Sequence, residues 1–270
     1  ALSMEVMRFL TRESFDVIVV GGYSTPTGML AILWLKMRNI PFVLNVDGGF
    51  VPSRENGIKK HIKSYFIKSA SAWLSTGQKT NEYLFHYGAK EDQTYVYPFT
   101  TMYESEILLS QPSLHDKVAI RRKLEIIESK MILTVGRFVY EKGFDILIRA
   151  CDGLPKDWGI YFVGGEPTEE YQELKEQYCL TNEHFAGFKS KEQLAEYYMA
   201  ADLFVLPTRG DVWGLVVNEA MSFGLPVITT DKCVAGLELI TDNANGFIVP
   251  VNDIEILRYR IMQVLSNDNL

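Results

Sequence analysis

The sequence predicts an α/β fold in which two Rossmann-like domains follow one another along the chain and face a common cleft. Two observations predict it. Short apolar runs, each about the length of one buried strand, alternate with longer amphipathic stretches along the whole chain. This alternation is typical of parallel sheets whose strands are joined by right-handed helical crossovers. The chain also has 270 residues, enough for two domains that each bury their own core.

The first domain is predicted to span residues 1–115 and to contain four strands. Apolar runs that end in Gly or Pro predict these strands, and the longer stretches between them predict helices. Residues 1–15 are expected to be helical. We expect strands at 16–20, 42–46, 72–75 and 95–97, and helices at 26–38, 57–70 and 77–87.

The second domain is predicted to span residues 116–270. A charged, helix-rich connection over 103–130 is interpreted as the hinge between the domains. The alternation of strand and helix restarts after it. The expected strands are 131–135, 160–163, 184–185, 203–206, 227–229 and 247–249. In open parallel sheets, ligands bind beyond the carboxyl ends of the strands.

Composition indicates which partners and which cellular compartment to expect. The net charge of −7 and the pI of about 5.3 disfavour nucleic acid, and the acidic excess lies in the second domain. No apolar run approaches the roughly 20 residues that span a bilayer. Cys151, Cys179 and Cys233 are too scattered to indicate a disulfide framework or a zinc site. We therefore expect a cytoplasmic protein with no bound metal.

Two cations follow the first strand of the second domain. Gly136 ends the strand, Arg137 follows, and Lys142 precedes the Gly143 that opens the next helix. A helix N-terminus with unpaired N–H groups, next to a guanidinium and an ammonium, suits a diphosphate. The alternative interpretation is that Arg137 and Lys142 are solvated loop cations.

Two carboxylates surround the start of a later helix. Asp211 lies in the loop and Glu219 lies inside the helix, with Gly214 between them where a ligand can approach the backbone closely. Both carboxylates are suited to accept hydrogen bonds from sugar or ribose hydroxyls. The alternative is that Asp211 is a helix N-cap and Glu219 an exposed helix carboxylate.

Together these patterns resemble the retaining glycosyltransferases of family 4, which have the GT-B fold. The resemblance rests on G-R-x-x-x-x-K-G at 136–143 and on two carboxylates separated by seven residues, Asp211 and Glu219. It rests also on Val163-Gly164-Gly165, on Gly187-Phe188 and on the run from Tyr198 to Asp202. It covers residues 116–270 and, more loosely, 16–102.

The resemblance implies a role for each matched residue. Arg137 and Lys142 bind the donor diphosphate, Glu219 binds the ribose, and Asp211 contacts the transferred sugar. This chain has Asp at a position where the family mostly has Glu, which shortens that contact by about one methylene. Phe188 and Lys189 are implied to border the base, and Gly214 and Leu215 to offer backbone N–H groups to the phosphates. The remaining donor-binding residues implied are Gly136, Gly164 and Val216.

The first domain is expected to depart from the family pattern, with its initial βα unit missing and the domain shortened. Asp47 occupies the position where the family often has a His that faces the donor sugar. We count Asp47 among the catalytic candidates, with a structural turn Asp as the alternative. Gly21 and Gly22, followed by Ser24 and Thr25, are expected to border the acceptor.

A basic stretch of the first domain suggests a membrane surface. The run IKKHIKSYFIK at 58–68 places apolar residues on one helical face among lysines. We interpret it as a contact to anionic lipid, which makes the protein peripheral on the inner face of the membrane. The alternative is a helix packed on the sheet with solvated lysines. The cations are Arg54, Lys59, Lys60, Lys63 and Lys68.

The resulting prediction is a hexosyltransferase that uses a nucleotide-sugar donor without a cofactor. It transfers the hexose with retention to a saccharide or lipid-linked acceptor, in cell-envelope polysaccharide or glycolipid synthesis. The alternatives are a non-catalytic nucleotide-sugar-binding scaffold and a nucleotide-sugar epimerase. A dinucleotide oxidoreductase is disfavoured, because no G-x-G-x-x-G follows an early strand.

Overall fold

The computed structural model describes residues 3–107, 113–178 and 180–266. It divides the chain into two compact units, Ala1–Phe99 and Thr100–Leu270. The domain boundary predicted between residues 115 and 116 falls inside helix α5, Leu114–Lys123. Cys151 and Cys233 are buried free thiols, and Cys179 lies outside the described residues. Within the described ranges, no helix is long and apolar enough to cross a membrane.

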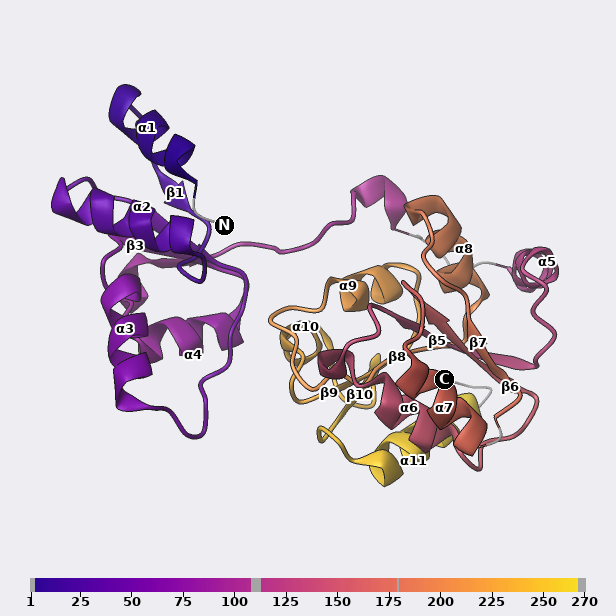
Figure 1. The fold of residues 1–270 in the computed structure, drawn as a ribbon. Helices are drawn as coiled ribbons and strands as arrows, with labels where there is room; N and C mark the ends of the chain where they lie inside the picture. The colour runs from indigo at the N-terminus through magenta and orange to yellow at the C-terminus, as the bar shows by residue number, and fades with distance from the viewer. Residues whose placement is uncertain (1–2, 108–112, 179, 267–270) are drawn as a thin grey trace. The chain divides into compact units, whose positions relative to one another are not determined.

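The first unit is a parallel sheet of four strands in the order β1-β2-β3-β4 (Figure 1). The strands are β1 Val19–Val20, β2 Val43–Val46, β3 Ala72–Ser75 and β4 Thr94–Val96. The helices are α1 Met4–Arg12, α2 Pro26–Met37, α3 Gly57–Ile67 and α4 Gln78–His86, and a 3₁₀ turn, η1, covers Glu91–Gln93. The observed strand β1 is shorter than the strand predicted at 16–20, because β1 is an edge strand that pairs only with β2.

Apolar residues at the expected positions form the core of this unit. Side chains from α2, α3 and α4 meet the buried faces of the strands, with Leu35, Leu44 and Leu84 fully buried. Trp73 is 2% exposed and donates its indole N–H to the Ile67 carbonyl at 2.9 Å. Each crossover helix therefore covers the sheet, as the sequence pattern predicts.

The second unit is a parallel sheet of six strands in the order β10-β9-β8-β5-β6-β7 (Figure 1). The strands are β5 Lys130–Val135, β6 Trp158–Val163, β7 Glu183–Phe185, β8 Leu203–Leu206, β9 Val227–Thr230 and β10 Gly246–Val249. Its helices are α5, α6 Phe144–Cys151, α7 Glu169–Gln177, α8 Lys191–Ala200, α9 Leu215–Ser222, α10 Val234–Leu239 and α11 Ile254–Leu265. Two 3₁₀ turns, η2 Glu104–Glu106 and η3 Tyr140–Lys142, complete it.

The central strands of this sheet are buried along their whole length, which explains their continuous apolar sequence. On one face, α6, α7 and α11 share a core with the strands that includes Phe144, Phe162 and Ile261. The strand order changes direction at β5 and β8, where β5 pairs with both β6 and β8. Crevices for ligands form at such switch points, beyond the carboxyl ends of the strands.

Candidate functional site

Three glycines form the floor of the site where β5, β6 and β7 end. The Gly136 N–H donates to the Val163 carbonyl at 2.8 Å, and the Gly164 N–H donates to the Gly187 carbonyl at 3.0 Å. A Cβ on Gly164 would lie 2.6 Å from the Gly136 carbonyl oxygen, so no side chain fits between these loops. The floor is therefore formed by closely packed backbone without side chains of its own.

Lys142 and Asp211 meet above this floor. The Lys142 Nζ lies 2.6 Å from Asp211 Oδ2, and the two side chains are only 22% and 14% exposed. The Lys142 side chain crosses Gly136, since a Cβ built there would lie 3.5 Å from its Cδ and Cε. The structure thus joins one cation and one carboxylate that the sequence analysis assigned to neighbouring parts of the donor site.

The loops that present these two residues are fastened to each other by backbone contact. Gly143 has φ of 66° and closes η3, and a Cβ on it would lie 2.1 Å from the Pro207 carbonyl oxygen. The Thr208 hydroxyl donates to the Glu141 carbonyl at 2.7 Å. The left-handed conformation and the close approach both require glycine at position 143.

Arg209 and Asp145 add a second fastening that the sequence analysis missed. The Arg209 guanidinium donates two hydrogen bonds to the Asp145 carboxylate, at 2.8 and 2.7 Å, and a third to the Tyr140 carbonyl at 2.8 Å. A bidentate pair of this kind fixes orientation as well as distance. No local pattern reveals it, because the two residues are far apart in the sequence.

Helix α9 begins at the edge of the same site. Its N-cap is Gly214, with φ of 97° and ψ of 58°, and a Cβ there would lie 2.6 Å from Cys233 Sγ. The alternative role of Asp211 as N-cap is therefore wrong. Asp211 instead accepts from the Trp213 N–H at 3.4 Å and pairs by backbone with Cys233. The first N–H groups of α9, including those of Leu215 and Val216, have no acceptor one turn earlier within the helix.

Glu219 lies deeper in α9 and is partly buried, so its alternative role as an exposed carboxylate is also wrong. The Tyr198 hydroxyl donates to Glu219 Oε2 at 2.9 Å. Burial raises the pKa of Glu219, and the hydrogen bond from Tyr198 works in the opposite direction. Burial and the adjacent carboxylate raise the pKa of Tyr198. Tyr198 was recognised only as part of a motif, and the structure gives it a contact.

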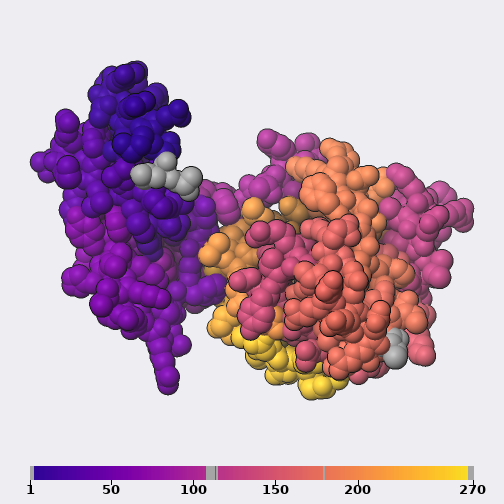
Figure 2. Space-filling model, viewed as in Figure 1, coloured from indigo at the N-terminus to yellow at the C-terminus, as the bar shows by residue number. Residues whose placement is uncertain are grey.

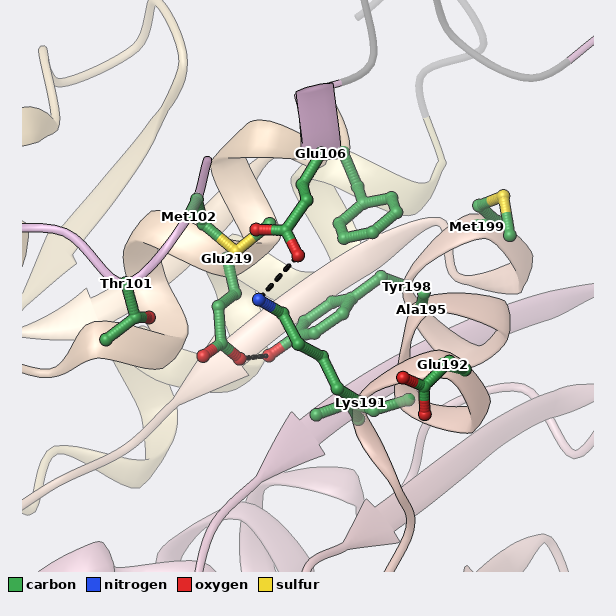
Figure 3. A pocket seen from close by; sticks show the side chains of 11 residues that line it. Thr101, Met102, Glu106, Lys191, Glu192, Ala195, Tyr198, Met199 and Glu219 are labelled. Atoms are coloured by element: carbon green, nitrogen blue, oxygen red, sulfur yellow. Dashed lines mark hydrogen bonds and ion pairs between the residues drawn. The ribbon is translucent and has the colours of Figure 1, made fainter. Parts of the chain in front are cut away.

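Glu219 is also part of the wall of a cavity of about 650 Å³ (Figure 3). An ion pair of 2.5 Å between Lys191 and Glu106 lies beside it. Neither residue was predicted. The wall is formed by Thr101, Met102, Glu106, Lys191, Glu192, Leu194, Ala195, Tyr198, Met199, Glu219 and Phe223.

Three predicted donor residues lie in exposed loops. Arg137 is exposed, and no described residue forms an ion pair with it. Phe188 is 81% exposed. Lys189 is half-buried, with Nζ 5.9 Å from the centre of the Tyr197 ring. Their roles toward a ligand stay predictions.

Asp47 lies in the first unit, directly after β2. Its Oδ1 accepts from the Asn45 amide at 2.7 Å and from the Tyr97 hydroxyl at 3.3 Å. Its backbone carbonyl accepts from the Thr76 hydroxyl at 3.1 Å. The exposed carboxylate therefore has a fixed position at the carboxyl edge of the first sheet.

The predicted basic face of α3 is only partly solvated. Lys63 is half-buried, with Nζ 3.5 Å from Glu55 Oε1 and donating to the Tyr87 hydroxyl at 3.1 Å, and its contact with a membrane stays a prediction. The other four cations are exposed: Arg54, Lys59, Lys60 and Lys68. The apolar side chains of Ile58, Ile62 and Tyr65 are exposed among them, at 72%, 48% and 43%.

Comparison with known proteins places residues 116–270 in the family model of glycosyl transferases group 1. An uncharacterized glycosyltransferase of Haemophilus influenzae is 33% identical over 155 residues, which are 56% of this chain and 43% of that protein. The putative teichuronic acid biosynthesis glycosyltransferase TuaC of Bacillus subtilis is 29% identical over 82% of this chain and 54% of its own length. The chain therefore spans about half of the length of these curated relatives.

Solved structures agree at the level of the fold. HepE of Anabaena in complex with UDP matches with a TM-score of 0.80, at 18% identity, over 97% of this chain and 72% of HepE. The complex of HepE with UDP-glucose matches with a TM-score of 0.77, at 18% identity, over 98% of this chain and 72% of HepE. The predicted fold class, α/β with parallel sheets of the GT-B type, is confirmed.

Proposed function

Because the chain belongs to the glycosyl transferases group 1, we propose that it moves a hexose from a nucleotide-sugar donor to a saccharide or lipid-linked acceptor. We propose further that it does so with retention, as in family 4. The observation that supports this most directly is the Lys142–Asp211 ion pair above the bare backbone of Gly136. A cation next to a helix N-terminus is suited to a diphosphate, and an adjacent carboxylate is suited to sugar hydroxyls.

The proposed reaction breaks the bond between the anomeric carbon and the diphosphate oxygen. Negative charge grows on the departing diphosphate, and Arg137, Lys142 and the N–H groups at the mouth of α9 stabilise it. Retention requires the acceptor oxygen to bond to the anomeric carbon on the face that the diphosphate leaves. The acceptor proton then passes to the leaving diphosphate. No general base is needed beside that face, and Asp211 contacts the transferred sugar.

The other donor contacts are assigned to the ribose, the phosphates, the base and the sugar in turn. Glu219 binds the ribose, held by Tyr198. Gly136 and Gly164 border the phosphates, together with the N–H groups of Gly214, Leu215 and Val216. Phe188 and Lys189 border the base, and Asp47 acts on the sugar or on the acceptor hydroxyl. Because preorganised cations and helix N–H groups supply the positive charge, we propose that turnover needs no metal, and activity in excess EDTA tests this.

The proposed function is tested by a transfer assay with UDP-, GDP- and ADP-hexoses and a panel of saccharide and lipid-linked acceptors. We expect transfer from one donor, with the anomeric configuration of the donor preserved in the product spectrum recorded by NMR. Inversion would refute the family 4 assignment. Binding of a nucleotide-sugar without transfer would support a scaffold, and conversion of the donor to its epimer would support an epimerase.

A membrane contact through α3 is proposed for the first unit. Its support is the exposed apolar row Ile58, Ile62 and Tyr65 beside the cations Lys59 and Lys60. Sedimentation with vesicles that contain anionic lipid at low salt tests it. Ile58→Ser should lower binding, whereas Ile127→Ser, at a residue 91% exposed in the second unit, should not. Equal binding to neutral and anionic vesicles would refute the proposal.

A further inference from the structure

The segment at the start of the second unit forms one wall of the cavity beside Glu219. We call residues 100–107 the strap. It contains η2 and is stiffened by its own hydrogen bond, in which the Tyr103 N–H donates to Glu106 Oε2 at 2.7 Å. Thr101, Met102 and Glu106 of the strap line the cavity opposite α8 and α9 (Figure 3). In the space-filling view, magenta atoms at the start of the second unit lie against the orange atoms of α8 (Figure 2).

A charged residue of α8 fastens the strap. Lys191, the first residue of α8, places Nζ 2.5 Å from Glu106 Oε1 and 5.6 Å from the centre of the Tyr103 ring. Both contacts are to strap residues. The side chains of Lys191 and Glu106 are 52% and 29% exposed, so the ion pair is at the rim of the cavity. It therefore closes the rim without filling the interior.

Glu219 and Tyr198 form the polar part of the interior. Lys191 lowers and Glu106 raises the pKa of Glu219, so the three charges lie within reach of one another. The rest of the wall is mostly apolar, with Met102 from the strap, Met199 from α8 and Phe223 after α9. A volume of about 650 Å³ lies within the range of small-molecule sites. A mostly apolar slot with the Glu219 carboxylate inside it suits a flat ring joined to a diol.

We propose that the strap encloses the nucleoside end of the donor, so that donor affinity depends on the Glu106–Lys191 ion pair and on Met102. This rests on the proposed function, since it assigns Glu219 to the ribose. The strap begins where the second unit begins, so the connection from the first unit becomes part of the nucleoside pocket. Nucleoside binding then depends on the strap, whereas binding of the diphosphate alone does not.

Calorimetry with UDP, GDP and inorganic pyrophosphate tests the proposal on the whole chain. Glu106→Gln should weaken binding of the preferred nucleoside diphosphate about two- to fivefold, the range expected for a partly exposed ion pair. Met102→Ala should weaken it as well. Neither change should alter binding of pyrophosphate. Hydrogen exchange of the strap amides should slow when the nucleotide is added to the wild type, and less so in Glu106→Gln.

Glu196→Gln is the matched control. Glu196 lies on α8, the helix that carries Lys191. It pairs with Lys123 of α5 and its side chain is 27% exposed, but it does not line the cavity. It should leave nucleotide binding unchanged. The role of the strap would be overturned if both Glu106→Gln and Met102→Ala bound the nucleoside diphosphate with wild-type affinity, or if they lost as much affinity for pyrophosphate. Either result would leave the proposed function standing. Absence of nucleotide binding by the wild type would overturn the proposed function as well.

Discussion

Lys142 is the residue whose removal should separate catalysis from folding. Its Nζ pairs with Asp211, and 22% of its side chain is exposed. Lys142→Ala should lower kcat by about 10²- to 10³-fold, or about 3–4 kcal/mol of transition-state stabilisation, because one preorganised cation is lost. Initial rates at saturating donor measure this. Lys123→Ala, at an ion-paired lysine outside the site, is the control and should keep the wild-type rate. Unchanged turnover in soluble Lys142→Ala would contradict the phosphate assignment.

Glu183 makes stability depend on pH. The residue is 1% exposed, both carboxylate oxygens lack a partner among the described residues, and burial raises its pKa to about 7. The folded pKa lies above the unfolded value, so the folded state binds the extra proton. Stability is therefore lost as pH rises from about 4.5 through about 7.

Urea denaturation of the wild type and Glu183→Gln measures this effect. From about pH 5 to about pH 8, the variant should gain about 2 kcal/mol of stability relative to the wild type. Glu173→Gln, at an exposed position of α7, is the control and should show no such trend. A constant difference between Glu183→Gln and the wild type would show that Glu183 titrates normally.

At this scale the sequence predicted residue types better than contacts. Lys142, Asp211 and Glu219 were identified because their spacing around two glycine turns resembles that of the family 4 glycosyltransferases. The hydrogen-bond partner of Glu219 was not, since Tyr198 reaches it from α8, a different helix 21 residues earlier in the chain. The contacts of Lys63 were missed for the same reason, because helical periodicity places it beside surface lysines and does not reveal its contacts with Glu55 and Tyr87.

Among the elements, the turn before α6 places the strictest requirement on residue type. Gly143 combines a positive φ with an approach to the Pro207 carbonyl that leaves no room for a methyl group. Gly143→Ala should therefore destabilise the protein by more than left-handed strain alone, which costs about 1–2 kcal/mol. Activity should fall too, because the turn sets the place of Lys142.

Gly153→Ala is the matched control for this turn. Gly153 also has a positive φ, 89°, but a Cβ there would meet nothing within 4 Å. Urea denaturation should show a loss for Gly143→Ala that exceeds the loss for Gly153→Ala by at least about 1 kcal/mol, the cost of overpacking. Equal losses of stability would mean that the backbone at Pro207 moves away from the added methyl group at no cost.

The elements themselves were largely predictable. Buried parallel strands are continuous apolar runs, and such runs located β3 and β8 at their observed bounds. The first strand was predicted too long, because the apolar run there is partly exposed at the sheet edge, with Val17 67% exposed. The strap was read only as a charged hinge, since its role comes from the two helices it lies against.

For the whole molecule, two separate cores predict that a ligand slows hydrogen exchange only in the unit that binds it. The first unit is built around Trp73 and the second around β5, β6 and their helices. A nucleoside diphosphate that binds only the second unit should slow hydrogen exchange there, at the loops after β5 and β8 and at α9. Amides of the first unit serve as the internal control, and protection confined to them would contradict the site.

The most direct test of the central claim is nucleotide binding to the wild type and to Lys142→Ala, measured by calorimetry and thermal shift with UDP and GDP. At 100 times its dissociation constant, the right nucleotide should add about 2.7 kcal/mol of stability to the wild type. Lys142→Ala should bind it far more weakly, while free uridine or guanosine binds both proteins equally. If Lys142→Ala binds the diphosphate as tightly as the wild type, the carboxyl edge of the six-stranded sheet is not the diphosphate site.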